Sequence, residues 1–125
     1  MFKVSCIQIS STNNINENLN ISKKLILKAI KQKSDFIITP ENSSLFGLNK
    51  KQLLKTATSM SKDIYLRGIK EMAKKYKKWI LTCVIIKEKN KIKNRSVLIN
   101  PKGLIKSYYD KMNMFDVKLS KNEKY

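Results

Sequence analysis

Residues 35–39, Asp-Phe-Ile-Ile-Thr, form a short and mostly apolar segment that stops at Pro40. Such a run between polar flanks is typical of a strand buried on both faces of a sheet. The stretch before it, residues 18–33, carries apolar side chains at helical spacing and predicts an amphipathic helix. Residues 2–10 alternate and are rich in β-branched side chains, which predicts an earlier strand. Strand, helix and strand in this order indicate a parallel βαβ unit.

The remaining elements expected are a second amphipathic helix and three strands, separated by polar or turn-forming residues. They are residues 61–78 for the helix and residues 79–87, 92–99 and 104–109 for the strands. A shorter helical turn is expected near residues 50–56, and the tail after Phe115 is polar and basic. The order β-α-β-α-β-β-β predicts an α/β fold, in which helices pack on a largely parallel sheet that continues as an antiparallel meander.

Length and composition restrict the class of protein further. A chain of 125 residues is long enough for one domain. It contains no apolar run near the ~20 residues that span a bilayer, and its first residues lack the layout of a signal peptide. We therefore expect a cytoplasmic protein without a membrane partner.

The residue types that are rare or missing exclude several kinds of site. The chain has no histidine, and its two cysteines, Cys6 and Cys83, are far apart in the sequence. This composition argues against a zinc site and a disulfide scaffold, so we expect no metal and no cofactor. Without histidine, the chain alone cannot provide a Ser–His–Asp or Cys–His catalytic group.

The net charge of +18 has two interpretations. Taken literally, it predicts binding to polyanions, because lysines near phosphates release counterions. However, all 27 basic residues except Arg67 and Arg95 are lysine, and arginine is the residue that reads bases and phosphates most specifically. The lysines are also spread along the chain among many isoleucines and asparagines, as in proteins from AT-rich genomes. We expect no specific nucleic-acid partner, and weak nonspecific polyanion binding stays open.

Two polar residues follow predicted strands. Glu41 comes directly after Pro40, at the carboxyl end of a buried strand, where open α/β sheets place their sites. A partly buried carboxylate there can act as a general base, although a solvated loop glutamate is the plainer interpretation. Lys111 follows the last predicted strand, and taken by itself it is one surface lysine among many.

Five segments in order resemble the carbon–nitrogen hydrolase (nitrilase/amidase) family, over essentially residues 2 to 125. They are KVSCIQISS, ENLNISKKLILKAI, DFIITPEN, KKYKKWILTCVI and NRSVLINPKGLIKSYYDKMNMFD. The last segment is the most specific of the five. The chain departs from the family at Asn113, where many members carry histidine, and at Thr82 and Cys83, which replace glycines.

The resemblance implies a fold and a mechanism. The fold is a four-layer αββα sandwich, of which residues 1–125 would be the N-terminal half, a single incomplete domain. Glu41 falls on the general base, and Lys111 falls on the lysine that stabilises the tetrahedral oxyanion. The family's nucleophile is a cysteine beyond the lysine segment. We expect Cys6 and Cys83 to be buried packing residues instead.

Three outcomes for the chain follow from the resemblance. It is expected to act on a small amide only when another half completes the domain, and to be inactive alone. Inward sheet positions left uncovered predict such a partner, self-association into a homo-oligomer, or a poorly stable product of a decayed gene. The alternative is a non-catalytic binding module or scaffold that associates with polyanions or with an intact relative.

Overall fold

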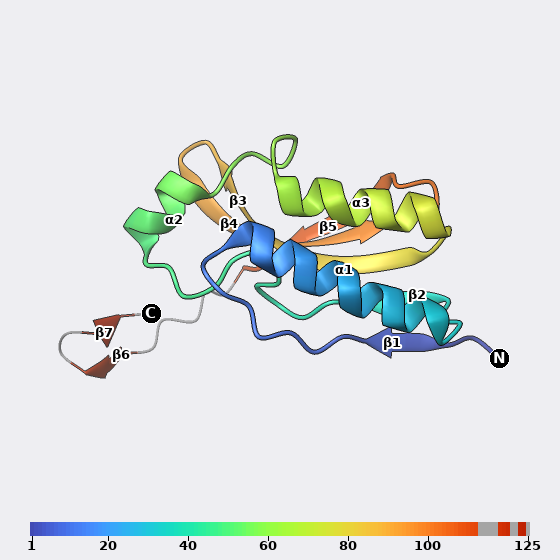
Figure 1. The fold of residues 1–125 in the computed structure, drawn as a ribbon. Coiled ribbons are helices and arrows are strands. Elements are labelled where there is room, and N and C mark those ends of the chain that lie inside the picture. The colour runs from blue at the N-terminus through green and yellow to red at the C-terminus, as the bar shows by residue number, and fades with distance from the viewer. Residues whose placement is uncertain (113–117, 121–122, 125) are drawn as a thin grey trace.

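A five-stranded sheet with helices on one face forms the body of the protein (Figure 1). The computed structural model describes residues 1–112, 118–120 and 123–124. The elements follow in chain order: β1 Val4–Cys6, α1 Ile15–Lys31, β2 Phe36–Ile38, α2 Lys50–Thr56, α3 Ile64–Tyr76, β3 Trp79–Glu88, β4 Lys91–Ile99, β5 Ile105–Asp110, β6 Lys118–Ser120 and β7 Glu123–Lys124.

The sheet has the order β1-β2-β3-β4-β5, which is also the order of the chain. The strands β1, β2 and β3 pair in parallel, and β3, β4 and β5 pair antiparallel. This arrangement confirms the predicted α/β class, with a parallel half followed by a meander. The sequence did not predict β6 and β7, which pair with each other in a separate two-stranded sheet within the polar tail.

One face of the sheet packs against α1 and α3, and the main core lies between these layers (Figure 1). Alternate strand residues point toward the helices, as period-two geometry requires. The strand residues of this core are Ile37, Ile80, Val84, Ile86, Val97 and Ile99. The helices contribute Ile26 and Ala29 from α1 and Leu66, Ile69 and Ala73 from α3, together with Tyr65 and Met72.

Side-chain caps set the ends of the helices. The Asn14 side chain accepts the backbone N–H groups of Asn16 and Glu17, so α1 begins three residues earlier than its apolar pattern predicted. The Asp63 side chain accepts the Leu66 N–H, so α3 begins later than expected. Lys77, in the left-handed conformation at φ 52°, ends α3.

The helices α1 and α3 approach closely at Gly68. Gly68 is buried, and a Cβ there would lie 2.7 Å from the Leu19 side chain of α1, so a larger residue does not fit without a shift. The structure also buries Tyr65, whose hydroxyl lies 2.9 Å from Ser22 Oγ. This hydrogen bond satisfies two polar groups inside the core, which explains why a tyrosine and a serine pack there. Ile64, in contrast, is only half-buried.

The second face of the sheet is largely open among the residues that the structure describes. By the strand register, this open face carries Val4, Ile38, Leu81 and Leu98, which are exposed or half-buried. Near its far end, Ile85 packs against Leu45 and Ala57 of the segment that follows β2. One helical layer and one sheet are two of the four layers that the resemblance implies.

Cys6 lies on the same open face, at the outer strand β1, and is exposed. The prediction that both cysteines are buried was therefore wrong for Cys6 and is confirmed for Cys83. The reason is that an edge strand with one uncovered sheet face leaves alternate side chains in solvent. None of the described helices is both long and apolar enough to cross a membrane.

Candidate active site

Glu41 and Lys111 are in direct contact, with 2.7 Å between Lys111 Nζ and Glu41 Oε1. Pro40 lies just beyond the last residue of β2 and places Glu41 at the end of that strand. Lys111 comes directly after β5. β3 is parallel to β2, and two successive antiparallel pairings give β5 the same direction as β3. The carboxyl ends of β2 and β5 therefore lie at the same end of the sheet, and Glu41 and Lys111, 70 positions apart in the sequence, become neighbours.

Asn94 of β4 lies between these two ends. Its Nδ2 donates hydrogen bonds to Glu41 Oε1 at 2.7 Å and to Asn42 Oδ1 at 3.0 Å. Its backbone carbonyl accepts the N–H of Lys111 at 2.9 Å. The sequence reasoning did not single out Asn94. The available signal was its position at the start of the specific segment NRSVLINPKG.

The carboxylate and the ammonium lie at the surface of the open sheet face. The Glu41 side chain is 52% exposed and that of Lys111 is 35% exposed. The Glu41 side chain, expected to be partly buried, is therefore about half exposed in this structure. Exposure lets a substrate reach both groups, and it also limits the strength of their ion pair.

Buried hydroxyl groups on the helix-covered side of the sheet stabilise the backbone around Pro40 through hydrogen bonds. Thr39 Oγ1 lies 2.8 Å from Thr82 Oγ1, and Ser43 Oγ donates to Thr39 Oγ1 at 3.0 Å. All three residues are buried. Thr82 thus points toward the helices and away from Glu41, so of the two residues that replace glycines only Cys83 is on the side of the site.

Cys83 is buried beside Asn94, with its side chain on the open face and 5% exposed. Its Sγ donates to Asn94 Oδ1 at 2.8 Å. Burial is the main cause that raises the pKa of the Cys83 thiol. A neutral, buried thiol is a poor nucleophile, which agrees with the packing role expected for Cys83.

The two cysteines are expected to differ in reactivity. In the folded 125-residue chain, iodoacetamide should modify Cys6, which is exposed, and spare Cys83. Peptide mass mapping measures this directly, and unfolding in urea should make both thiols reactive. Rapid modification of Cys83 in the folded chain would contradict the burial described above.

Arg95, the neighbour of Asn94, fixes the end of β5 from the helix-covered face. Its Nε and Nη2 donate to the two carboxylate oxygens of Asp110, the residue before Lys111. The Arg95 side chain is buried, and its guanidinium also lies 4.0 Å from the ring centroid of Tyr108. A bidentate pair of this kind holds a strand end in one geometry.

This pair predicts a pH dependence of stability. The hydrogen bond from Arg95 lowers the pKa of Asp110 below its usual value. A lowered folded-state pKa stabilises the fold above the unfolded-state pKa, and this contribution is lost as the pH falls below about 4. Urea unfolding at several pH values measures the free energy of unfolding, which should fall less steeply below about pH 4 in Asp110→Asn than in the unchanged chain. An equally steep fall of this free energy in both chains would contradict the role of the pair.

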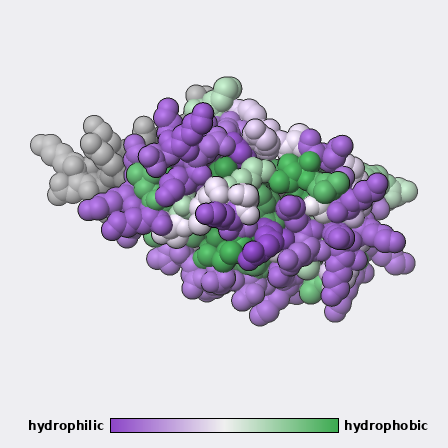
Figure 2. Space-filling view, turned by 90° about the horizontal axis from the view of Figure 1, so that it is seen from above, coloured by the Kyte–Doolittle hydropathy of each residue, from purple (hydrophilic) through white to green (hydrophobic). Residues whose placement is uncertain are grey.

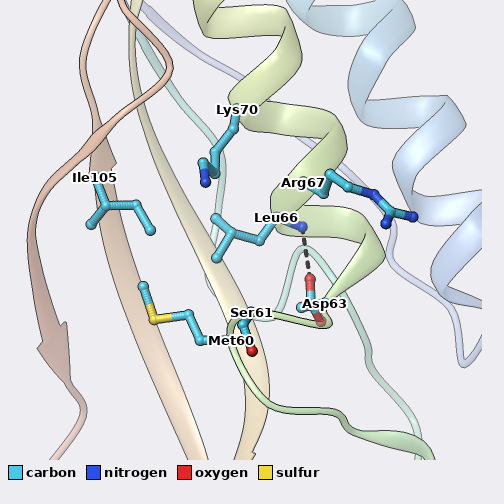
Figure 3. A pocket seen from close by; sticks show the side chains of 7 residues that line it. All are labelled: Met60, Ser61, Asp63, Leu66, Arg67, Lys70 and Ile105. Carbon is cyan, nitrogen blue, oxygen red and sulfur yellow. Dashed lines mark hydrogen bonds between the residues drawn. The ribbon is translucent and has the colours of Figure 1, made fainter.

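Two cavities lie away from Glu41 and Lys111. One cavity of about 390 Å³ is lined by the start of α3 and by Met60 and Ile105, as Figure 3 shows. A second, of about 440 Å³, lies beside the β3–β4 hairpin and is lined by four lysines. No group of three or more potential metal ligands occurs among the described residues. Asn113, where the sequence departs from the family, lies outside them.

The family model of carbon-nitrogen hydrolases matches residues 3–125, which is nearly the whole sequence. The chain belongs to the carbon–nitrogen hydrolase family. Among curated relatives, it is 27% identical over 128 residues to a deaminated glutathione amidase of Synechocystis sp. (strain PCC 6803 / GT-S), covering 99% of this chain and 46% of that protein. It is 24% identical over 120 residues to the nitrilase and fragile histidine triad fusion protein NitFhit of Caenorhabditis elegans, covering 93% of this chain and 27% of that one.

Two solved structures, of NitFhit and of an amidase, share the fold of this chain. The crystal structure of C. elegans NitFhit matches with a TM-score of 0.82 and 23% identity, over 100% of this chain and 32% of that one. An amidase from Nesterenkonia sp. matches with a TM-score of 0.78 and 15% identity, over 91% of this chain and 44% of that one. The chain therefore spans between about a quarter and about a half of the length of these relatives.

Proposed function

We propose that this chain provides the general base and the oxyanion-stabilising lysine of an amidase that cleaves non-peptide C–N bonds of small amides. The observation that carries the proposal is the 2.7 Å contact between Lys111 Nζ and Glu41 Oε1, at one edge of the sheet of a carbon–nitrogen hydrolase. The names of two relatives, a deaminated glutathione amidase and an amidase from Nesterenkonia sp., support an amide as the substrate class.

In the proposed reaction, Glu41 accepts the proton of a cysteine thiol, and the thiolate attacks the amide carbon. The ammonium of Lys111 stabilises the negative charge that develops on the carbonyl oxygen. Glu41 then donates its proton to the leaving amine, which departs from the acyl-enzyme. Finally Glu41 accepts a proton from the water that attacks the thioester and donates it to the departing sulfur, which releases the acid and restores both the thiol and the carboxylate.

The nucleophile in this proposal comes from outside residues 1–125. Cys83 is buried and hydrogen-bonded to Asn94, and Cys6, on the edge strand β1 and on the same open face, makes no hydrogen bond to Glu41 or Lys111 in the part of the chain that the structure describes. A partner segment that covers the open sheet face would both supply the nucleophile and bury the exposed apolar side chains. Association of two copies of the chain through this face is the other way to cover it.

A second candidate function is a basic binding module or scaffold. It is favoured by the net charge of +18 and by the cavity lined by Lys55, Lys62, Lys87 and Lys89. Figure 2 shows that hydrophilic side chains cover most of one face of the molecule, with apolar patches between them. Binding of this kind would weaken steeply with salt and would hardly change on Lys111→Ala, whereas amide hydrolysis would be lost.

The test compares the 125-residue chain with the complete enzyme, meaning this chain together with the segment that carries the nucleophile. Release of ammonia from a simple linear amide is expected from the complete enzyme and not from the chain alone. Turnover by the isolated chain that disappears on Glu41→Gln would contradict the need for a nucleophile from outside it.

A further inference from the structure

Asn94 contacts both residues of the proposed site, Glu41 and Lys111, and its own side chain is fixed by a hydrogen bond from Cys83. Its side chain donates to Glu41 Oε1, its carbonyl accepts the Lys111 N–H, and its Oδ1 accepts from Cys83 Sγ. Its side chain also donates to Asn42 Oδ1, at the residue after Glu41. Asn94 is only 6% exposed, so it is a buried polar residue, and its side-chain hydrogen bonds join Glu41, Asn42 and Cys83.

The chemistry of the neighbours fixes the orientation of the Asn94 amide. An ionised carboxylate only accepts hydrogen bonds, so the amide atom that faces Glu41 must be the Nδ2 donor. The other amide atom, Oδ1, then faces Cys83, whose protonated sulfur is a donor. Each end of the amide meets a group of the complementary kind, and the rotated amide would place two acceptors against each other.

We infer that Asn94 is a positioning residue for the proposed reaction, which aims the carboxylate of Glu41 at the reacting proton and anchors the backbone of Lys111. This inference rests on the proposed function. Glu41 is half-exposed and follows a proline on a loop, so without a fixed donor its carboxylate could adopt many rotamers. Asn94 restricts them from a buried position on a central strand, as a precise site requires.

The first test uses the 125-residue chain and needs no activity. The two Nδ2 protons of Asn94 are expected to exchange with water about tenfold or more slowly than those of the exposed Asn20, because one binds a carboxylate. In Glu41→Ala, one of the two protons should lose this protection, while the proton bound to Asn42 keeps it. Exchange of both protons at the rate of Asn20, or no response to Glu41→Ala, would overturn the inference.

The second test uses the complete enzyme. Asn94→Asp keeps the shape of the side chain and replaces the donor with a carboxylate, which repels Glu41. We expect kcat to fall by about tenfold or more while KM changes by less than about threefold, as for a group that acts only through the transition state. Asn100→Asp is the matched control at the other end of β4, because Asn100 uses only Oδ1, as an acceptor from Lys102 and Leu104 N–H.

The outcomes distinguish a failure of the inference about Asn94 from a failure of the proposed amidase function. If Glu41→Gln abolishes turnover and Asn94→Asp keeps the full kcat, the inference is wrong and the proposed function stands. If Glu41→Gln also keeps the full kcat, the proposed function is wrong. If Asn94→Asp does not fold, Asn94→Ser replaces it, since serine leaves a small donor that cannot reach both partners, and a full kcat in that variant would again overturn the inference.

Discussion

Replacing Lys111 with methionine is expected to lower amide turnover by the complete enzyme by about 10²–10³-fold, the usual effect of removing one preorganised oxyanion donor. Methionine keeps much of the length of the lysine side chain and removes the ammonium that lies 2.7 Å from Glu41 Oε1. The loss should appear mainly in kcat, because the charge on the carbonyl oxygen develops in the transition state rather than in the bound substrate. Steady-state kinetics with a simple linear amide measures it.

Lys106→Met is the matched control for this change. Lys106 lies on β5 as an exposed lysine with no ion pair among the described residues. Its replacement removes the same charge five residues earlier in the sequence, so any general effect of net charge on folding or substrate attraction is shared. Equal activity of the two variants would show that Lys111 has no special role in turnover.

Replacing Ile80 with alanine is expected to destabilise the chain by about 2–5 kcal/mol, the range for removing a large aliphatic side chain from a packed core. Ile80 is fully buried in the middle of the sheet, on the face that α1 and α3 cover. A typical domain is stable by about 5–15 kcal/mol, so this single change removes a large share of the total. Urea unfolding of the 125-residue chain, followed by circular dichroism, measures the free energy of unfolding.

Leu104→Ala removes the same number of carbon atoms from an exposed position. Leu104 is 56% exposed in the turn before β5, so a change within about 0.5 kcal/mol is expected. The contrast between the two variants tests where the core lies. A small effect of Ile80→Ala, or similar effects of both substitutions, would contradict a core between the sheet and the two helices.

The order of the elements could be predicted because local pattern and tertiary fold agree along most of the chain. The mostly apolar run before Pro40 is short and clearly bounded, so β2 and the position of Glu41 could be inferred from a few residues. The segment of residues 50–56, predicted as a helical turn, is α2 with the same limits. The capping box between Asn49 and Gln52 gives the physical reason, because it satisfies the first free N–H groups of that short helix.

What the sequence did not predict depends on neighbours that are distant along the chain. Asn94 has no local feature that distinguishes it from the many other asparagines, and its role appears only when β4 is placed between Glu41 and Lys111. Exposure of Cys6 follows from the place of β1 at the edge of the sheet, which alternation alone cannot predict. Burial of Tyr65 likewise depends on a distant partner, because its hydroxyl is satisfied by Ser22 of α1, 43 residues away in the sequence.

The most direct test of the central claim is the rate of ammonia release by the complete enzyme with Glu41→Gln, compared with Glu71→Gln. Glutamine keeps the size of the Glu41 side chain and cannot accept the thiol proton, whereas Glu71 is an exposed residue of α3. We predict that Glu41→Gln reduces turnover by about 10²–10⁴-fold, the usual contribution of a general base, and that Glu71→Gln leaves it unchanged. Full turnover in Glu41→Gln would show that the pair formed by Glu41 and Lys111 is not the catalytic pair.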